Sequence, residues 1–188
     1  MISRIDHVSI AVKNYEKAFD FFHHVLGAVP GKGGDETDLK FYYRVFSLGD
    51  LTRIEIIKPL EEGSFLENFL NNKKEGGVHH ITLEVPDIRA FKQTLDDINV
   101  PYFGYSEERS DWKELFIHPK DAFGVLIQIA EFDPEVYLDA SVKFPKEEKW
   151  SVQKNNTGAA VDFAHPGGGK VRIELTRAEI DLLIQDLS

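Results

Sequence analysis

The chain has 188 residues, 42% hydrophobic and 12% aromatic, a composition typical of a globular protein with one main core. Its net charge of −10 argues against nonspecific nucleic-acid binding, which needs basic surface. The absence of cysteine excludes disulfides, thiolate metal ligands and a catalytic thiol. The apolar runs are too short for a membrane span and the N-terminus lacks the apolar core of a signal peptide, so we expect a cytoplasmic protein.

Residues 1–60 predict a β-α-β-β-β unit. Residues 4–12 alternate between two faces, as in a strand with one side against a core. Asn14 can cap the next helix, whose apolar residues recur at helical spacing, and Gly27 ends it. Three further strands complete the unit: one near Val29, one at 41–48 and one at 52–57.

After a polar linker, residues 76–131 repeat the same order of elements. A strand at 78–85 precedes a helix that Asp87 caps. The remaining strands are predicted at 102–103, 115–117 and 125–129. We therefore predict an α+β fold, in which two tandem βαβββ modules form a shared cavity lined by a curved sheet. This domain is expected to span residues 1–131, with modules at about 1–60 and about 76–131.

Beyond residue 131 the repeat ends. Residues 133–156 are polar and rich in Lys and Glu, which is typical of a surface excursion. The rest predicts a small β-hairpin and helix: strands at 160–164 and 170–175 around a turn at 166–169, then a capping box at 176–179. We interpret residues 132–188 as a C-terminal extension without an assigned role, packed on the main domain or at a subunit interface.

The two modules also repeat their chemistry. His7 and Glu55 are 48 positions apart, as are His80 and Gln128 (55 − 7 and 128 − 80). The second pair lies 73 positions after the first, and the flanking strands agree with that shift. Independent surface residues have no reason to repeat in register, so the spacing indicates one shared site. Strand alternation points His79 away from this site, and we interpret His79 as structural.

Two imidazoles, a carboxylate and an amide are a donor set for a divalent metal ion such as Zn, Co, Ni, Mn or Fe(II). The predicted ligands are His7, Glu55, His80 and Gln128. Because only one carboxylate neutralises the ion, the site favours Lewis-acid polarisation of a carbonyl. Either Glu55 leaves the ion to act as a base, or Gln128 is the displaceable ligand. The alternative is an ancestral site that no longer binds metal.

Three segments resemble the vicinal oxygen chelate superfamily, which includes glyoxalases and bleomycin resistance proteins: Ile5-Asp6-His7-Val8-Ser9-Ile10, Gly77-Val78-His79-His80-Ile81 and His118-Pro119-Lys120-Asp121. Within it, residues 3–131 are most similar to the methylmalonyl-CoA epimerases. The resemblance implies a metal-dependent 1,2-proton shift through an enolate, on an acyl-CoA such as methylmalonyl-CoA. It also implies the same four metal ligands and an acid/base pair that removes and returns the α-proton.

Some positions depart from the family pattern. Gln128 stands where the family usually has Glu, and an amide cannot act as a general base. The family draws another base from a Glu-rich segment before its third strand. Here Glu36 or Asp38 could serve, beside the interpretation of residues 33–40 as a solvated acidic loop. The candidate catalytic residues are therefore Glu55 and Glu36, and Phe123 in place of a small residue indicates an altered pocket.

Other functions of the same scaffold stay open. A glyoxalase I-like lactoylglutathione lyase would use similar enediolate chemistry on a glutathione hemithioacetal. An iron-dependent dioxygenase would need a carboxylate on the last strand, where Gln128 stands. A binding protein of the bleomycin-resistance type would sequester a small molecule without catalysis. In each case the expected partner is a small molecule, with neither nucleic acid nor membrane, and the scaffold commonly forms a homodimer.

Overall fold

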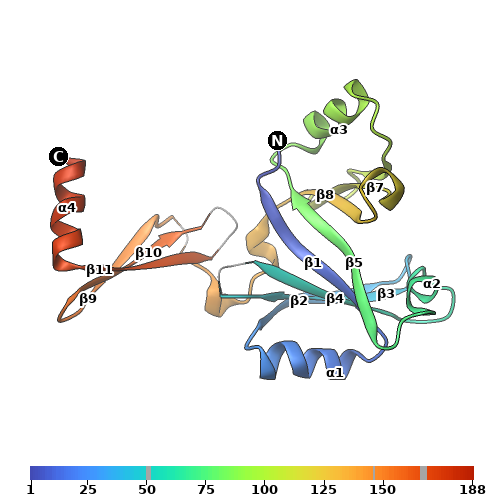
Figure 1. The fold of residues 1–188 in the computed structure, drawn as a ribbon, viewed down its shortest axis with the longest axis horizontal. Coiled ribbons are helices and arrows are strands. Elements are labelled where there is room, and N and C mark those ends of the chain that lie inside the picture. Colours follow the sequence, from blue (N-terminus) through green and yellow to red (C-terminus); the bar gives the residue numbers. More distant parts are fainter. Residues whose placement is uncertain (50–51, 146, 166–168) are drawn as a thin grey trace.

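The structure, a computed structural model, describes residues 1–49, 52–145, 147–165 and 169–188. It contains an eight-stranded sheet in the order β2-β3-β4-β1-β5-β8-β7-β6 and a three-stranded sheet in the order β11-β10-β9. Figure 1 shows the large sheet curving on the right and the small sheet projecting to the left. The predicted α+β fold with two βαβββ modules around a curved sheet is confirmed.

The first module forms one half of the large sheet. Asn14 caps its helix by accepting a hydrogen bond from the Lys17 amide, and Gly27 ends the helical segment with a φ of +72°. The helix continues into a π-helical turn, which the sequence pattern did not predict. The elements are β1 (Arg4–Val12), α1 (Tyr15–Asp20), η1 (Phe21–Val25), β2 (Val29–Glu36), β3 (Phe41–Ser47) and β4 (Arg53–Pro59).

The second module forms the other half, after the connecting helix α2 (Leu66–Leu70). Asp87 caps its helix as predicted, accepting from the amides of Arg89 and Ala90. The elements are β5 (Gly76–Glu84), α3 (Ile88–Asp97), β6 (Phe103–Ser106), β7 (Trp112–Ile117), η2 (Pro119–Asp121) and β8 (Leu126–Phe132).

The pairing of the central strands shows that positions 73 residues apart in the sequence are also structurally equivalent. Strands β1 and β5 pair antiparallel, with His7 opposite Thr82 and Ser9 opposite His80. Ser9 also pairs with Glu55 on β4, just as Thr82 pairs with Gln128 on β8. Exchanging the modules therefore reproduces the same pairs, which is the signature of a pseudo-two-fold axis between β1 and β5.

The outer face of the sheet is apolar and carries helices α1 and α3. Helix α1 packs on one cluster that includes Phe46 and Ile56, and α3 packs on another that includes Leu115 and Ile129. Figure 1 places these helices at opposite ends of the sheet. Since strand residues alternate between faces, His7 and His80 point to the inner, concave face.

The C-terminal extension differs from the expected hairpin. It is a three-stranded sheet with a helix: β9 (Trp150–Lys154), β10 (Gly158–Ala164), β11 (Lys170–Thr176) and α4 (Arg177–Leu187). Strand β9 lies in the segment expected as a surface excursion, because Trp150 and Val152 align with apolar residues of β10. Tyr137, Leu138 and Phe144 of the same segment are buried. The turn predicted at 166–169 lies mostly outside the described residues, and the domain boundary at residue 131 stays a prediction.

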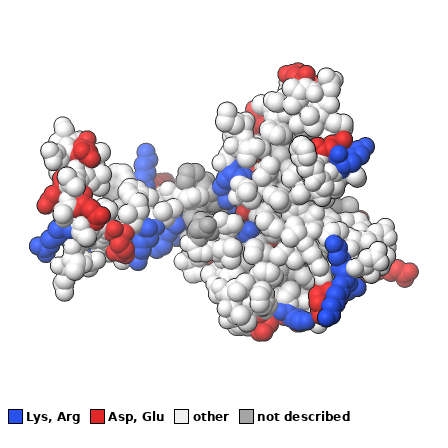
Figure 2. Space-filling model, viewed as in Figure 1, with Lys and Arg blue, Asp and Glu red and all other residues white. Residues whose placement is uncertain are grey.

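The surface agrees with the charge of the chain. Lys and Arg lie in small groups among acidic residues on the face drawn in Figure 2, without forming one continuous basic patch. In the described part of the chain, no helix is both long and apolar enough to cross a membrane.

Candidate metal centre

Three of the four predicted ligands converge on the concave face. His7 Nε2 and His80 Nε2 each lie 3.7 Å from Glu55 Oε2. One donor atom from each of the three residues lies within 4.8 Å of the other two. They come together because β4, β1 and β5 are neighbours in the sheet and each presents one of them on the same face.

The chemistry of this triad fits a divalent ion. Zinc binds imidazole nitrogen and carboxylate oxygen at about 2 Å, which separates neighbouring tetrahedral donors by roughly 3–3.5 Å. The observed 3.7 Å contacts are close to that separation. Two nitrogens and one oxygen also suit Co, Ni, Mn and Fe(II), so the donor set does not select one metal.

Asp6 orients His7. Its Oδ2 lies 2.7 Å from His7 Nδ1, and since an ionised carboxylate only accepts, Nδ1 donates this hydrogen bond and Nε2 is the ring nitrogen left to face the centre. Burial raises the pKa of Asp6, but the hydrogen bond and charge of His7 and the charge of Arg53 outweigh it and lower the pKa to about 2. Asp6 reaches His7 because it is the extra residue of a β-bulge between Ile5 and His7.

Arg53 completes this arrangement from β4. Its guanidinium is 1% exposed and pairs with Asp6 Oδ1, while Nη1 donates to the Pro134 carbonyl at 3.0 Å. A second cation, Arg4, contacts the same Asp6 oxygen at 2.5 Å. Sequence reasoning assigned no role to Asp6 or Arg53, although an acid directly before a ligand-type histidine is the signal that could have found Asp6.

His80 has a different neighbour. Burial, followed by the charges of His7 and His79, holds the pKa of His80 well below its usual range, so the ring is neutral. Its Nδ1 lies 2.9 Å from Nδ1 of His79. The prediction that alternation points His79 away is therefore wrong, because a bulge in the pairing of β1 with β5 makes His79 the extra residue of β5. Burial lowers the pKa of His79 to about 4, and its ring packs against Phe65 and Phe69. A neutral His80 can offer its Nε2 lone pair to an ion.

Glu55 is the carboxylate of the centre. Burial raises its pKa against the charge of His7, and the negative charges of Asp6 and Glu114 raise it further. A buried carboxylate in that position is costly unless a cation compensates it. The electrostatics of Glu55 therefore support the same conclusion as the geometry of the triad.

Gln128 lies beside the triad and is hydrogen-bonded on both sides. Its Oε1 accepts from the Thr82 hydroxyl at 2.5 Å, and its Nε2 donates to Glu114 Oε2 at 2.6 Å. The same hydroxyl also lies 2.9 Å from His7 Nε2, so Thr82 links His7 to Gln128. Gln128 as a fourth ligand stays a prediction. Thr82 and Glu114 were missed, and alternation along β7 could have placed Glu114 on the face of Gln128.

A cavity of about 170 Å³ opens beside the centre and brings both predicted catalytic residues together. Glu36, Glu55 and Glu114 all line it. Glu36 is the last residue of β2 rather than part of a solvated loop, and it accepts from Arg109 Nη1 at 3.2 Å. Asp38 lies in the exposed turn that follows and does not line this cavity.

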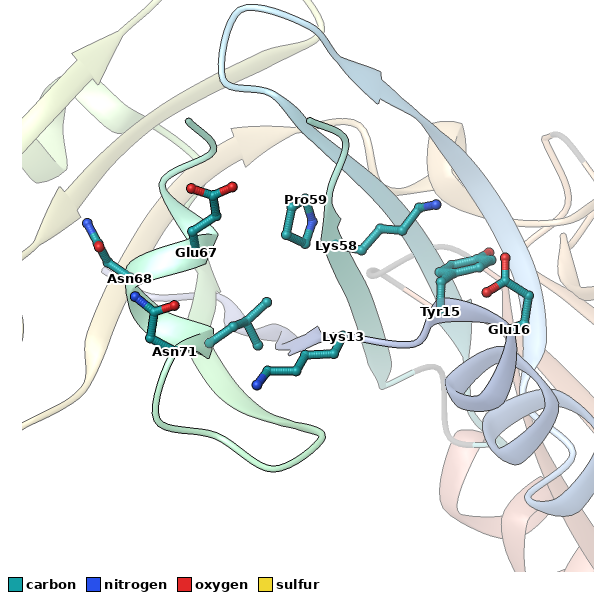
Figure 3. Close-up of a pocket in the computed structure, with 9 residues that line it drawn as sticks. Lys13, Tyr15, Glu16, Lys58, Pro59, Glu67, Asn68 and Asn71 are labelled. Carbon is teal, nitrogen blue, oxygen red and sulfur yellow. The ribbon is translucent and has the colours of Figure 1, made fainter. Parts of the chain in front are cut away.

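A larger depression, of about 510 Å³, lies at one end of the sheet (Figure 3). It contains none of the predicted ligands. Lys13 and Lys58 bring two positive charges to its wall, and Glu16 and Glu67 bring two negative charges. This balance gives no net attraction for an anionic group, so we assign the chemistry to the smaller cavity.

Comparisons with known proteins agree with this geometry. Residues 6–116 match the model of the glyoxalase/bleomycin resistance protein/dioxygenase superfamily. The chain belongs to this superfamily, in which the vicinal oxygen chelate fold pairs two such modules.

Its relatives include methylmalonyl-CoA epimerases. The chain is 37% identical to the ethylmalonyl-CoA/methylmalonyl-CoA epimerase of Cereibacter sphaeroides, covering 70% of this chain and 99% of that protein. It is 33% identical to the human mitochondrial methylmalonyl-CoA epimerase, covering 69% and 74%. The structure of the Mycobacterium tuberculosis methylmalonyl-CoA epimerase superposes with a TM-score of 0.64 at 28% identity, covering 70% and 89%.

Proposed function

We propose that the protein is a metal-dependent epimerase that moves the α-proton of an acyl-CoA such as methylmalonyl-CoA through an enolate. The observation that supports it most is the His7–Glu55–His80 centre opening onto a cavity that holds further carboxylates. The 37% identity to the Cereibacter epimerase, over 99% of that protein, supports the same chemistry. We assign this activity to residues 1–131, the domain predicted from the repeat.

His7, Glu55 and His80 would hold the ion, with Gln128 as the proposed fourth ligand. A divalent ion bound there supplies a Lewis acid for the thioester carbonyl, whose oxygen gains charge as the α-proton leaves. Asp6 keeps His7 Nε2 directed into the centre, and burial keeps His80 neutral. His80 therefore presents an unprotonated nitrogen, as metal binding requires.

Proton transfer needs one group to remove the α-proton and another to return it on the opposite side. We assign these roles to Glu36 and Glu55, which line one cavity from different strands, and Glu55 would have to leave the ion to exchange a proton. Arg109 orients the Glu36 carboxylate through its 3.2 Å hydrogen bond. Gln128 cannot exchange a proton and instead fixes Glu114 by donating to it.

The decisive experiment measures metal content and deuterium exchange at the α-carbon of methylmalonyl-CoA in D₂O. We expect bound metal and exchange in the wild type, and loss of both in His7→Ala. His24→Ala is the matched control, because His24 is exposed on η1 and outside the cavity. Bound metal without exchange would reject the epimerase, and a wild type that binds no metal would reject the metal centre as well.

A further inference from the structure

Tyr137 lines the same cavity as Glu55 and Gln128, although it lies beyond residues 6–116 that match the superfamily model. It is the last residue of the short 3₁₀ turn η3 (Pro134–Tyr137), which follows the final strand of the large sheet. The residue is 6% exposed. A segment outside the matched region therefore contributes a side chain to the wall of the candidate active site.

The turn η3 is anchored at two points. Arg53 donates to the Pro134 carbonyl at 3.0 Å, and its guanidinium lies 6.0 Å from the centre of the Tyr137 ring. The Tyr137 carbonyl approaches Gly31 of β2 so closely that a Cβ there would lie 2.2 Å from this oxygen. Glycine is needed at position 31 for this approach, which indicates that the first module is shaped to receive the turn.

The Tyr137 ring is held by its neighbours, while its hydroxyl has no hydrogen-bond partner among the residues that the structure describes. The ring packs edge-on against Trp112 and Phe132, with centroids 5.5 and 5.6 Å away, and the Lys32 ammonium lies 4.8 Å from its centre. Among the described residues, no group forms a hydrogen bond with the hydroxyl. Burial raises the pKa of Tyr137, so the phenol stays protonated and can donate.

A carboxylated acyl group could use such a donor in addition to the metal ion. The ion would compensate Glu55, but Glu36 and Glu114 also line the cavity and would repel an incoming carboxylate. The guanidinium of Arg109 is already shared between Glu36 and Asp111. A buried hydroxyl with a free proton is therefore well suited to offset this repulsion, since a hydrogen bond to a charged group is stronger than one between neutral groups.

We propose that the Tyr137 hydroxyl binds the free carboxylate of the acyl group and so selects carboxylated acyl-CoA thioesters over uncarboxylated ones. This inference rests on the proposed function, which supplies the substrate class. It makes η3 part of the active site, and Tyr137 a specificity-determining residue that the superfamily region alone does not contain.

The test compares the dissociation constants of malonyl-CoA and propionyl-CoA for the metal-loaded full chain. We expect the wild type to prefer malonyl-CoA and Tyr137→Phe to lose roughly 10- to 100-fold of that preference, with propionyl-CoA binding unchanged. Tyr105→Phe is the matched control, because Tyr105 is exposed on β6 and does not line the cavity. Tyr43→Phe probes the other phenol of the cavity wall.

An unchanged preference in Tyr137→Phe overturns the proposal, as does a loss confined to Tyr43→Phe or a wild type that binds neither thioester. Deuterium exchange at the α-carbon of methylmalonyl-CoA separates this result from the proposed function. If exchange occurs but Tyr137→Phe does not change the preference for malonyl-CoA, the role of Tyr137 is rejected and the epimerase proposal stands. If no exchange occurs but malonyl-CoA binding still depends on Tyr137, the epimerase proposal is rejected and the role of Tyr137 in specificity stands. An unchanged melting temperature of Tyr137→Phe excludes a folding effect.

Discussion

The two modules present their histidines at equivalent positions but support them differently. In the first module, the neighbour of His7 is Asp6, an ionised acid that accepts from Nδ1 and pairs with buried Arg53. In the second, the equivalent neighbour of His80 is His79, a neutral ring packed among phenylalanines. Duplication has kept the backbone register while the surrounding chemistry diverged. One histidine is held by charge and the other by burial.

The residues that supply a side-chain oxygen in each module, Glu55 and Gln128, also differ in their chemistry. Glu55 carries its own carboxylate, whereas the equivalent Gln128 is neutral and donates to Glu114 on the next strand. Glu114 pairs with Ala130 across β7 and β8, and the equivalent pair in the first module is Tyr43 with Ile57. The second module therefore holds its carboxylate one strand further out, where the first has a phenol.

Removing either histidine should have the largest effect. We expect His7→Ala and His80→Ala each to lower divalent-ion affinity by more than about 100-fold, which exceeds the 10- to 100-fold typical of outer partners. Isothermal titration with Zn or Co measures this for both variants beside the His24→Ala control. A loss in one variant alone would show that the ion belongs to one module rather than to both.

Substituting Asp6 and His79 should show whether His7 depends on a charged neighbour and His80 on burial. Asp6→Asn is expected to weaken ion binding by about 10- to 100-fold, because His7 loses the acceptor that fixes its tautomer. It should also lower the free energy of unfolding, since the Arg53 charge is left buried and uncompensated. His79→Phe should weaken ion binding less than Asp6→Asn does, because His80 keeps its packing and loses a hydrogen bond to a neutral ring rather than to a charged group. Equal losses in both variants would contradict the distinction between charge and burial.

His79 and Asp6 should lose their contributions to the free energy of unfolding in different pH ranges. Burial lowers the pKa of His79 to about 4 in the folded protein. As the pH falls from 6.5 towards 4, the unfolded chain therefore binds a proton that the folded protein does not, and the free energy of unfolding decreases. Asp6, with a pKa lowered to about 2, keeps its contribution above pH 4 and loses it between pH 4 and 2.

We expect the contribution of His79 to the free energy of unfolding to fall by about 2 kcal/mol between pH 7 and pH 5, measured with a chelator present. Urea unfolding at the two pH values, in wild type and His79→Phe, measures it. The variant should lose less stability over this window than the wild type. If both lose the same amount, His79 is not buried in its neutral form.

The sequence predicts the centre well where duplication determines it. A 48-residue spacing repeated in both modules identifies His7 and Glu55 as partners, and the 73-residue shift selects His80 over its neighbour His79 as the counterpart of His7. Alternation does not separate the two histidines, because His79 is the extra residue of a bulge and contacts His80. The assignment of His7, Glu55 and His80 as ligands itself stays a prediction that ion titration tests.

The supporting residues could be predicted only in part from the same signals: alternation along β7 places Glu114 on the face of Gln128 but does not bring the two into contact. Asp6 reaches His7 through a bulge, and bulges leave no mark in an alternating pattern. Glu114 and Gln128 meet through pairing of β7 with β8. Tyr137 enters the cavity only because Arg53 and Gly31 anchor its turn, which is a tertiary contact between segments far apart in the chain.

The smallest expected effect tests whether the modules can be made chemically alike. Gln128→Glu gives the second module the carboxylate of the first, but it replaces a donor that lies 2.6 Å from Glu114 Oε2 with a like charge. We therefore expect the single variant to change ion affinity by less than about tenfold, because repulsion offsets the added ligand charge. Gln128→Glu combined with Glu114→Gln keeps one carboxylate and one amide in contact and should bind the ion more tightly than either single variant.

Ion titration of the wild type, both single variants and the double variant forms a complete cycle. Residues in one hydrogen-bonded network couple by about 0.5–3 kcal/mol, so the double variant should exceed the sum of the single effects by an amount in that range. Additive effects would mean that Gln128 and Glu114 act independently. The carboxylate of Glu114 would then not be the counterpart that the second module places one strand away from Glu55.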